Sequence, residues 1–373
     1  MDIAVVSFYA VTNIGDKILT ETVCWFLRKM GHNTTIVDLN GRYTYKYSGF
    51  IGKIERVICP FLIKRNTESS QKAYFKKTLK NKDFILFAGG QIIDTSVTNC
   101  SYNIYNIVKI AEEEGIPVGF NAVGLAGRDF GSEKGKLLKY ALSSLHVVHL
   151  TARERIDDIN TFLLSPTSTP RAKWVCDTAV WCSECYNVKV LNRNSKLVGI
   201  NVVSEVVLSR YHKEAIDFVK LYADIYSTLT QKGFNCYFFT NGVQRDNLTL
   251  YKILAYLNLS SDRIMSPTDT NKGKSFIKML SQFGFIISSR LHTSISAYSL
   301  KIPTIALAWD DKIPLFYKSI GYTERCIDIL QSNNKNYLID LVSNTWSNGY
   351  DNEKYNNYRK TVFDSLNNIS FTI

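Results

Sequence analysis

Two short apolar runs, separated by a segment with helical character, constrain the fold of this 373-residue chain more than any other feature. The runs cover residues 283–288 and 304–309, and each has the length and branching of a buried strand. Between them, apolar residues fall on one side of a helix that Thr293 or Ser294 can cap, and Pro303 prevents that helix from continuing. A strand, a helix and a second strand in this order predict parallel strands, and therefore an α/β fold with doubly wound sheets.

Arg290 and His292 fall where the first of these strands ends and the helix begins. Ligands bind at that edge of open α/β sheets, and a helix N-terminus there favours anions. A guanidinium and an imidazole at this place predict a site for an anion that carries phosphate or carboxylate. The structural alternative is that Arg290 pairs with a nearby carboxylate and that His292 is an ordinary loop histidine.

The pattern of this stretch resembles the signature of the polysaccharide pyruvyltransferase family. The shared residues are Arg-Leu-His at 290–292, Ile295, Ala297, Ile302, Pro303 and the strand that ends in Asp310, Asp311 and Lys312. Thr293 departs from the family, which often has glycine there. The resemblance implies two Rossmann-like domains facing a cleft, as in GT-B glycosyltransferases. It also implies transfer of pyruvyl from phosphoenolpyruvate to two hydroxyls of a sugar, which gives a cyclic ketal and releases phosphate.

Two turns in the first half of the chain follow apolar strands and contain glycine. Asn13-Ile-Gly15-Asp16 precedes a helical pattern, so its backbone N–H groups could cradle a phosphate or a sugar, and it matches the family's Asn-x-Gly-Asp opening. Gly89 and Gly90 follow a strand at residues 83–88 and would let a ligand approach the backbone closely. The second turn is not a dinucleotide fingerprint, and the family usually has a third glycine where this chain has Gln91.

Two further candidates, Asp94 and Arg153, come from positions that match the family. Asp94 falls where some relatives carry a functional aspartate, and the alternative is a helix cap. Arg153 takes the place of the arginine in the family's Arg-Asp pair, with Glu154 in place of the aspartate. Its structural alternative is a pairing with Asp157, Asp158 or Asp177.

We assign roles on this basis. Arg290 and Arg153 are expected to clamp the anionic donor, and Lys312 is a weaker phosphate ligand. His292 is the phosphate partner or the acid, and Asp94 is a candidate base for the sugar hydroxyl. The turn residues expected to bind substrate are Asn13, Gly15, Asp16, Gly89 and Gly90. No cofactor beyond the donor phosphoenolpyruvate is expected. The only CxxC, Cys182 to Cys185, lacks the second pair that a structural zinc site needs and does not open a helix in a thioredoxin-like setting, so we expect neither metal nor redox chemistry there.

The length suits two domains. We expect an N-terminal α/β domain over residues 1–188, with a basic insertion at about 42–82. A C-terminal α/β domain over 189–350 would bind the donor. Residues 351–373 are predicted to form a helical tail that can cross back to the first domain.

The formal charge of +12 concentrates in the basic segment. Residues 42–82 hold eleven Lys or Arg and two Glu, a net charge of +9, with aromatic residues between them. Such a segment could contact anionic lipid head groups or a lipid diphosphate. The alternatives are nucleic-acid binding, for which no recognised motif is present, and a solvated helical insertion. The sequence shows no basic leader and no apolar run near the roughly 20 residues that span a bilayer. We expect a cytoplasmic protein, able to sit at the inner face of the membrane, that acts on a saccharide or lipid-linked saccharide and binds no nucleic acid.

Two rival functions remain open on the sequence. A glycosyltransferase that uses a nucleotide sugar would share the fold, bind UDP or GDP tightly and ignore phosphoenolpyruvate. A non-catalytic protein that binds membranes or nucleic acid through residues 42–82 would show strongly salt-dependent binding that survives loss of Arg290.

Overall fold

The computed structural model describes residues 1–9, 13–41, 68–96, 100–191, 195–208 and 217–370. The chain folds into two compact units. Unit 1 holds residues 1–11, 23–177 and 362–373, and unit 2 holds residues 12–22 and 178–361. The division therefore falls after Asp177, earlier than the expected boundary between residues 188 and 189, and it assigns a short N-terminal segment to unit 2.

Unit 1 is built on a parallel sheet in the order β2-β1-β3-β5-β6-β7, with β4 also paired to β5. The strands are β1 (Asp2–Ser7), β2 (Asn33–Asp38), β3 (Phe84–Phe87), β4 (Gly90–Asp94), β5 (Val118–Ala126), β6 (Val147–Ala152) and β7 (Lys173–Trp174). The chain winds outward in one direction through β2 and in the other from β3 onward. This doubly wound order confirms the Rossmann-like architecture expected from the sequence.

The glycine pair after β3, which the sequence predicts to let a ligand approach the backbone, joins β3 to β4. Gly89 (φ +96°) and Gly90 (φ +76°) kink the chain so that it re-enters the sheet as β4. A Cβ on Gly89 would lie 3.0 Å from the carbonyl oxygens of Asn121 and Ala122 in β5. Ala122 is itself left-handed (φ +52°), at a point where the pairing of β5 with β6 shifts register. Gly89 is therefore explained by the close approach of β5, which runs to Ala126.

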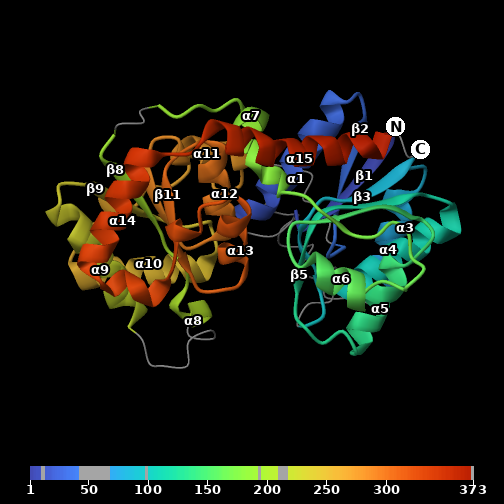
Figure 1. Ribbon diagram of the computed structural model, residues 1–373. Coiled ribbons are helices and arrows are strands. Elements are labelled where there is room, and N and C mark those ends of the chain that lie inside the picture. The colour runs from blue at the N-terminus through green and yellow to red at the C-terminus, as the bar shows by residue number, and fades with distance from the viewer. Residues whose placement is uncertain (10–12, 42–67, 97–99, 192–194, 209–216, 371–373) are drawn as a thin grey trace, which may run out of the picture. The chain divides into compact units, whose positions relative to one another are not determined.

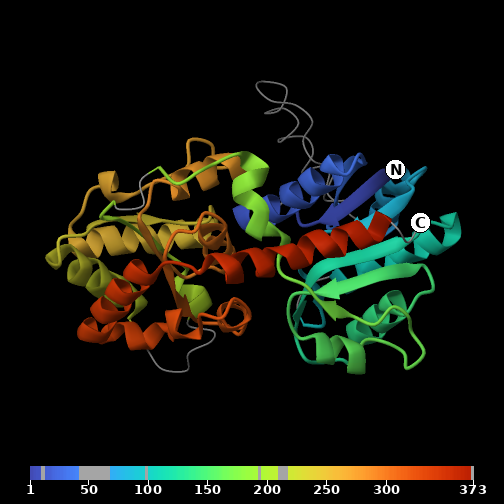
Figure 2. The ribbon, with the colours of Figure 1, turned by 45° about the horizontal axis from the view of Figure 1, so that its top comes forward.

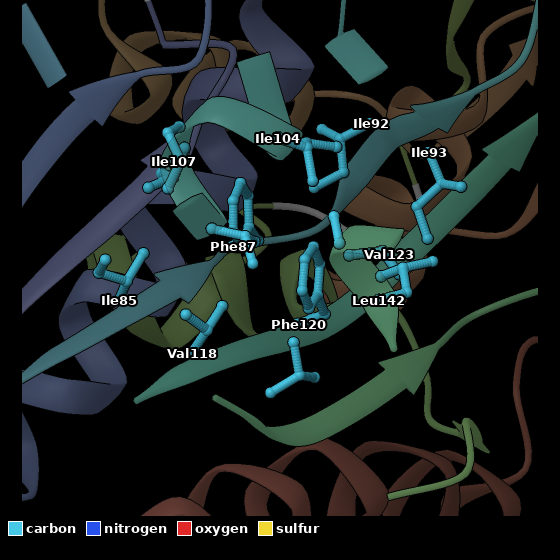
Figure 3. Close-up of a cluster of buried hydrophobic side chains, with 14 of the residues drawn as sticks. Ile85, Phe87, Ile92, Ile93, Ile104, Ile107, Val118, Phe120, Val123 and Leu142 are labelled. Carbon is cyan, nitrogen blue, oxygen red and sulfur yellow. The ribbon is translucent and has the colours of Figure 1, made fainter. Parts of the chain in front are cut away.

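Among the described residues of unit 1, a core cluster lies between one face of the sheet and four helices (Figures 1 and 3). These are α3 (Glu68–Leu79), α4 (Cys100–Glu114), α5 (Glu133–Leu142) and α6 (Ile156–Phe162). Phe87 and Phe120 stack at its centre with ring centroids 4.4 Å apart. Phe75 and Leu79 of α3 are fully buried, so the described part of the basic segment is a layer of the fold. The rest of that segment, residues 42–67, lies outside the described residues.

Unit 2 is a second doubly wound parallel sheet, in the order β12-β11-β10-β8-β9. Its strands are β8 (Leu197–Asn201), β9 (Asn235–Phe239), β10 (Phe285–Ser288), β11 (Thr304–Ala308) and β12 (Cys326–Asp328). The winding reverses between β8 and β10, so the crevice where such sheets bind ligands lies at the carboxyl ends of these two strands. β10, α12 (Leu291–Ser299) and β11 form the strand–helix–strand unit that the sequence predicts.

Helices cover both faces of the second sheet (Figure 1). Phe238 of β9 packs in the cluster formed with α9 (Phe218–Gln231), α10 (Gln244–Leu257) and α14 (Lys335–Asn348). Phe239 points to the other face and contacts Phe276 of α11 (Gly273–Leu280), because successive residues of a strand alternate between faces. Among the residues that the structure describes, the other α-helices are α1 (Ile14–Lys29), α7 (Cys182–Tyr186), α8 (Glu205–Leu208), α13 (Lys312–Ser319) and α15 (Asn352–Ser370).

The C-terminal helix α15 contributes residues to both units and is one continuous ribbon in Figures 1 and 2. Its residues from Val362 onward belong to unit 1. There Ser365 donates a hydrogen bond to Asn121 Oδ1 (3.2 Å) and lies 3.2 Å from His149 Nε2. No helix among the described residues is long and apolar enough to cross a membrane.

Candidate active site

The loop after β10 places Arg290 at the start of α12. Ser288 Oγ donates to the Arg290 carbonyl (2.9 Å) and accepts from its N–H (3.3 Å), which closes the turn. Arg290 is the N-cap of α12, and its side chain makes no capping hydrogen bond. The prediction that Thr293 or Ser294 caps it was wrong, because the helix begins earlier and the Thr293 hydroxyl donates to Asn241 Oδ1 (2.8 Å). The N-terminal N–H groups of α12 therefore lie at the carboxyl end of the sheet, and neither the Arg290 side chain nor the Thr293 hydroxyl caps them.

Arg290 forms a bidentate ion pair with Asp246 of α10. Its Nη2 lies 2.6 Å from both carboxylate oxygens, and its Nε lies 3.1 Å from Oδ2. Asp246 is fully buried and also accepts the Ser204 N–H (2.9 Å). Burial raises the pKa of the Asp246 carboxyl, and the Arg290 charge opposes that rise. The pairing named as the alternative for Arg290 is thus present, and none of the bonds of Arg290 to described residues uses Nη1.

His292, in the first turn of α12, packs directly against Gly15. A Cβ at Gly15 would overlap His292 Nδ1 and lie 2.6 Å from its Cβ, so only glycine fits there. The Gly15 N–H donates to Asn13 Oδ1 (3.2 Å), and the Asn13 amide donates to Asp16 Oδ2 (3.0 Å). The Asn-x-Gly-Asp turn at the start of α1 and the Arg-Leu-His sequence at the start of α12 therefore form one site, in unit 2.

Asn241 holds this site together, although no role was predicted for it. Its carbonyl accepts the Ile14 N–H (3.3 Å), and its Oδ1 accepts the Thr293 hydroxyl and the Asn201 amide (3.1 Å). The signal in the sequence was the Asn241-Gly242 pair at the end of β9. Asp246, five residues later, gave no signal, because its partner Arg290 is 44 residues away.

Lys312 opens α13 after β11. Its Nζ lies 3.2 Å from Asp310 Oδ2, and Asp310 Oδ1 accepts the N–H groups of Lys312 (3.2 Å) and Ile313 (3.3 Å). The ammonium is thus held by a carboxylate on its own turn.

The predicted site residues of unit 1 are held by partners within that unit. Arg153 Nη1 binds Asp177, and its Nε lies 3.4 Å from Glu154 Oε2. All three side chains are buried, with at most 6% of any exposed. Asp177 is one of the partners that the structural alternative for Arg153 named. A Cβ at Gly124 would lie 2.6 Å from Glu154 Oε1 and 3.1 Å from Arg153 Nη2, so this glycine makes room for the cluster.

Asp94 lies at the end of β4 and is 5% exposed. Its Oδ1 accepts hydrogen bonds from the Ser96 N–H (2.7 Å) and hydroxyl (2.6 Å). The carboxylate thus caps the turn that follows the strand, and its role as a base remains a prediction.

The CxxC differs from expectation in one respect, because Cys182 does begin a helix, the short α7. Cys182 is buried, which raises the pKa of its thiol to about 12 and leaves it a poor nucleophile. Over the residues that the structure describes, no group of three or more His, Cys, Asp or Glu is placed to hold a metal ion.

Comparison with known proteins adds a family and a fold. Residues 13–311 match the family described as polysaccharide pyruvyl transferase. No curated protein matches the chain.

Among solved structures, the chain resembles UDP-GlcNAc 2-epimerase from Methanocaldococcus jannaschii, with a TM-score of 0.59, 13% identity and 100% of both chains covered. It also resembles UDP-GlcNAc 2-epimerase from Neisseria meningitidis bound to UDP-GlcNAc, with a TM-score of 0.56, 14% identity, and 100% of this chain and 99% of that one covered. At such identities the likeness shows the fold alone, which is GT-B.

Proposed function

Because the chain belongs to the polysaccharide pyruvyl transferase family, we propose that it transfers pyruvyl from phosphoenolpyruvate to two hydroxyls of one sugar residue. The two hydroxyl oxygens bond to C2 of the donor, and the C2–O bond to phosphate breaks. One hydroxyl proton ends on the enol methylene, which becomes a methyl group, and the other leaves with phosphate. The product is a cyclic ketal that keeps the pyruvate carboxylate.

One observation carries this proposal: the Asn-x-Gly-Asp turn and the Arg-Leu-His sequence meet at Gly15 and His292. The donor places a carboxylate and a phosphate a few bonds apart, so its site needs several N–H donors within a small volume. Arg290 and the N-terminus of α12 supply such donors, and the N-terminus of α1 begins beside them. Lys312 follows the neighbouring strand β11, and we assign it to the phosphate.

His292 is the residue of this site that can transfer a proton near neutral pH. We propose that it protonates the enol carbon or the departing phosphate, and that Arg290, which stays charged, orients the donor through Nη1. Asp94 and Arg153 belong to unit 1. Their assignments as base and second anion clamp stay predictions, as does membrane contact through residues 42–82.

A thermal-shift experiment tests the donor. Ligand at a hundred times its Kd stabilises the folded protein by about 2.7 kcal/mol. Millimolar phosphoenolpyruvate should therefore raise the melting temperature, and pyruvate or inorganic phosphate alone should raise it less. If phosphoenolpyruvate leaves it unmoved while UDP- or GDP-sugars raise it, the donor is a nucleotide sugar and the proposal fails.

Two variants separate holding the donor from transforming it. Arg290→Lys keeps the charge but loses the planar fork, so the donor KM should rise while kcat falls less. His292→Gln keeps a hydrogen bond but carries no proton, so kcat should fall by roughly 10²–10⁴ with donor affinity little changed. Loss of donor affinity alone in His292→Gln would make His292 a phosphate ligand. Unchanged kinetics in both variants would make the site structural.

A further inference from the structure

A separate pocket of about 110 Å³ opens at the carboxyl end of the second sheet, within unit 2. Its walls come from the end of β9, the first turns of α10 and the segment around residues 264–270. Buried Leu250 and Phe276 form its apolar part, and Tyr251 on α10 forms an open wall with 58% of its surface exposed. Ligands of open α/β sheets bind at this edge.

The pocket adjoins the His292 site through shared residues. Asn241 lines the pocket, and its Oδ1 accepts a hydrogen bond from the hydroxyl of Thr293, the residue after His292. Ile14 also lines it and precedes Gly15, which packs against His292. A ligand in the pocket would therefore be a close neighbour of a donor held at His292.

The lining identifies the kind of ligand that would fit. None of the described residues that line the pocket is charged. Its polar groups are side-chain amides and hydroxyls, and the Thr240 hydroxyl fixes the Asn247 amide by bonding to its Oδ1 (2.5 Å). The aromatic face of Tyr251 and the apolar side chains of Leu250 and Phe276 complete the lining of the pocket. Neutral ligands that carry hydroxyls on one side and C–H groups on the other match such a lining, because an aromatic ring can cover the apolar face while amides bond the rim.

We infer that this pocket binds a pyranose ring of the acceptor saccharide, with Tyr251 as its stacking platform. The inference rests on the proposed function, which identifies the neighbouring site at His292 as the donor site. It adds the place where the acceptor sugar is held. The donor site offers cationic and N–H groups to an anion, whereas the pocket beside it offers neutral groups to an uncharged ring. The two substrates are thus separated by charge.

Saturation-transfer NMR with methyl β-D-glucopyranoside and methyl β-D-galactopyranoside tests the pocket without a known acceptor. The full-length protein should transfer saturation to at least one glycoside. Tyr251→Ala should weaken that binding about tenfold, and Tyr251→Phe should retain it, since the aromatic face is kept. Tyr256→Ala is the matched control, because Tyr256 is on the same helix, is 56% exposed and does not line the pocket.

Several results would overturn the inference. The first is no saturation transfer to either glycoside at high millimolar concentration. The second is an equal loss of glycoside binding in Tyr251→Ala and Tyr256→Ala. The third is that uridine, and neither glycoside, binds at Tyr251. The phosphoenolpyruvate thermal shift is read on the same samples. A normal donor shift without glycoside binding refutes the pocket alone, whereas glycoside binding at Tyr251 without a donor shift refutes the donor alone.

Discussion

Replacing Asp246 by asparagine should both destabilise unit 2 and loosen the proposed donor site. The carboxylate is fully buried and accepts three hydrogen bonds from Arg290 and one from the Ser204 N–H. Asparagine has almost the same shape, but it removes the charge and turns one acceptor into a donor that faces the guanidinium. Removing one partner of a buried ion pair costs roughly 3–5 kcal/mol.

The expected cost for Asp246→Asn is smaller than that for two reasons. The Arg290 side chain is 20% exposed, so water can solvate part of its charge, and the remaining amide oxygen still accepts a hydrogen bond. The desolvation that raises the pKa of Asp246 also disappears with its charge. We therefore expect a loss of about 2 kcal/mol. For a unit of this size that corresponds to a melting temperature lower by about 4–8 °C.

The control for this variant is Asp340→Asn, the same chemical change at an exposed position on α14 of the same unit. Melting is followed by circular dichroism, and donor binding by the phosphoenolpyruvate thermal shift. The donor KM should rise at least as much as in Arg290→Lys, with a smaller change in kcat, because Asp246 orients Arg290 without touching the donor. If the melting temperature of Asp246→Asn lies within about 1 °C of that of Asp340→Asn, the ion pair between Arg290 and Asp246 contributes no net stability. If the donor KM is also unchanged, Asp246 does not position Arg290.

Two further substitutions test the site and the packing of α15. Gly15→Ala should abolish the phosphoenolpyruvate thermal shift, because the new Cβ would lie 2.6 Å from His292 Cβ. The control Gly131→Ala, whose new Cβ would have its nearest neighbour 4.0 Å away, should retain the shift. A normal shift in Gly15→Ala would contradict the packing of Gly15 against His292. Burial lowers the pKa of His149 to about 4, so the native state favours the neutral ring. The free energy of unfolding should therefore be highest at pH values above the ordinary pKa of 6.5 and should fall as the pH drops toward 4. Urea midpoints measured across that range should show a smaller decline in His149→Gln, and an equal decline would assign the acid sensitivity to other groups.

Periodicity and turn residues predicted the parts of the fold that depend on local sequence. The runs at 283–288 and 304–309 became the buried parallel strands β10 and β11, since each is short, branched and bounded by a helix or a turn. The exact start of α12 was missed, because Ser288 closes the turn before Arg290 and Thr293 bonds to another strand's loop. Local sequence does not record which long-range partner a hydroxyl will take.

The unpredicted features depend on contacts between distant segments. Gly15 has the sequence context of a turn residue, yet the structure requires glycine there because His292 occupies the space of its Cβ. Gly89 was interpreted as room for a ligand, and β5 fills that room. Ala122 adopts a left-handed conformation with no sequence signal, since only the shifted register around it explains the backbone.

Each unit places an arginine close to the carboxyl end of a strand and binds it to a buried aspartate: Arg290 with Asp246 in unit 2, and Arg153 with Asp177 in unit 1. A guanidinium that is already paired attracts an incoming anion less through its charge, because the aspartate cancels most of the long-range field. The ion pair still fixes the plane of the guanidinium, and therefore the direction of the N–H groups that remain available to the anion. Recognition of the donor in unit 2 should then depend on hydrogen-bond geometry and on the N-terminus of α12. This is why lysine, which keeps the charge but not the plane, should be a poor substitute for Arg290.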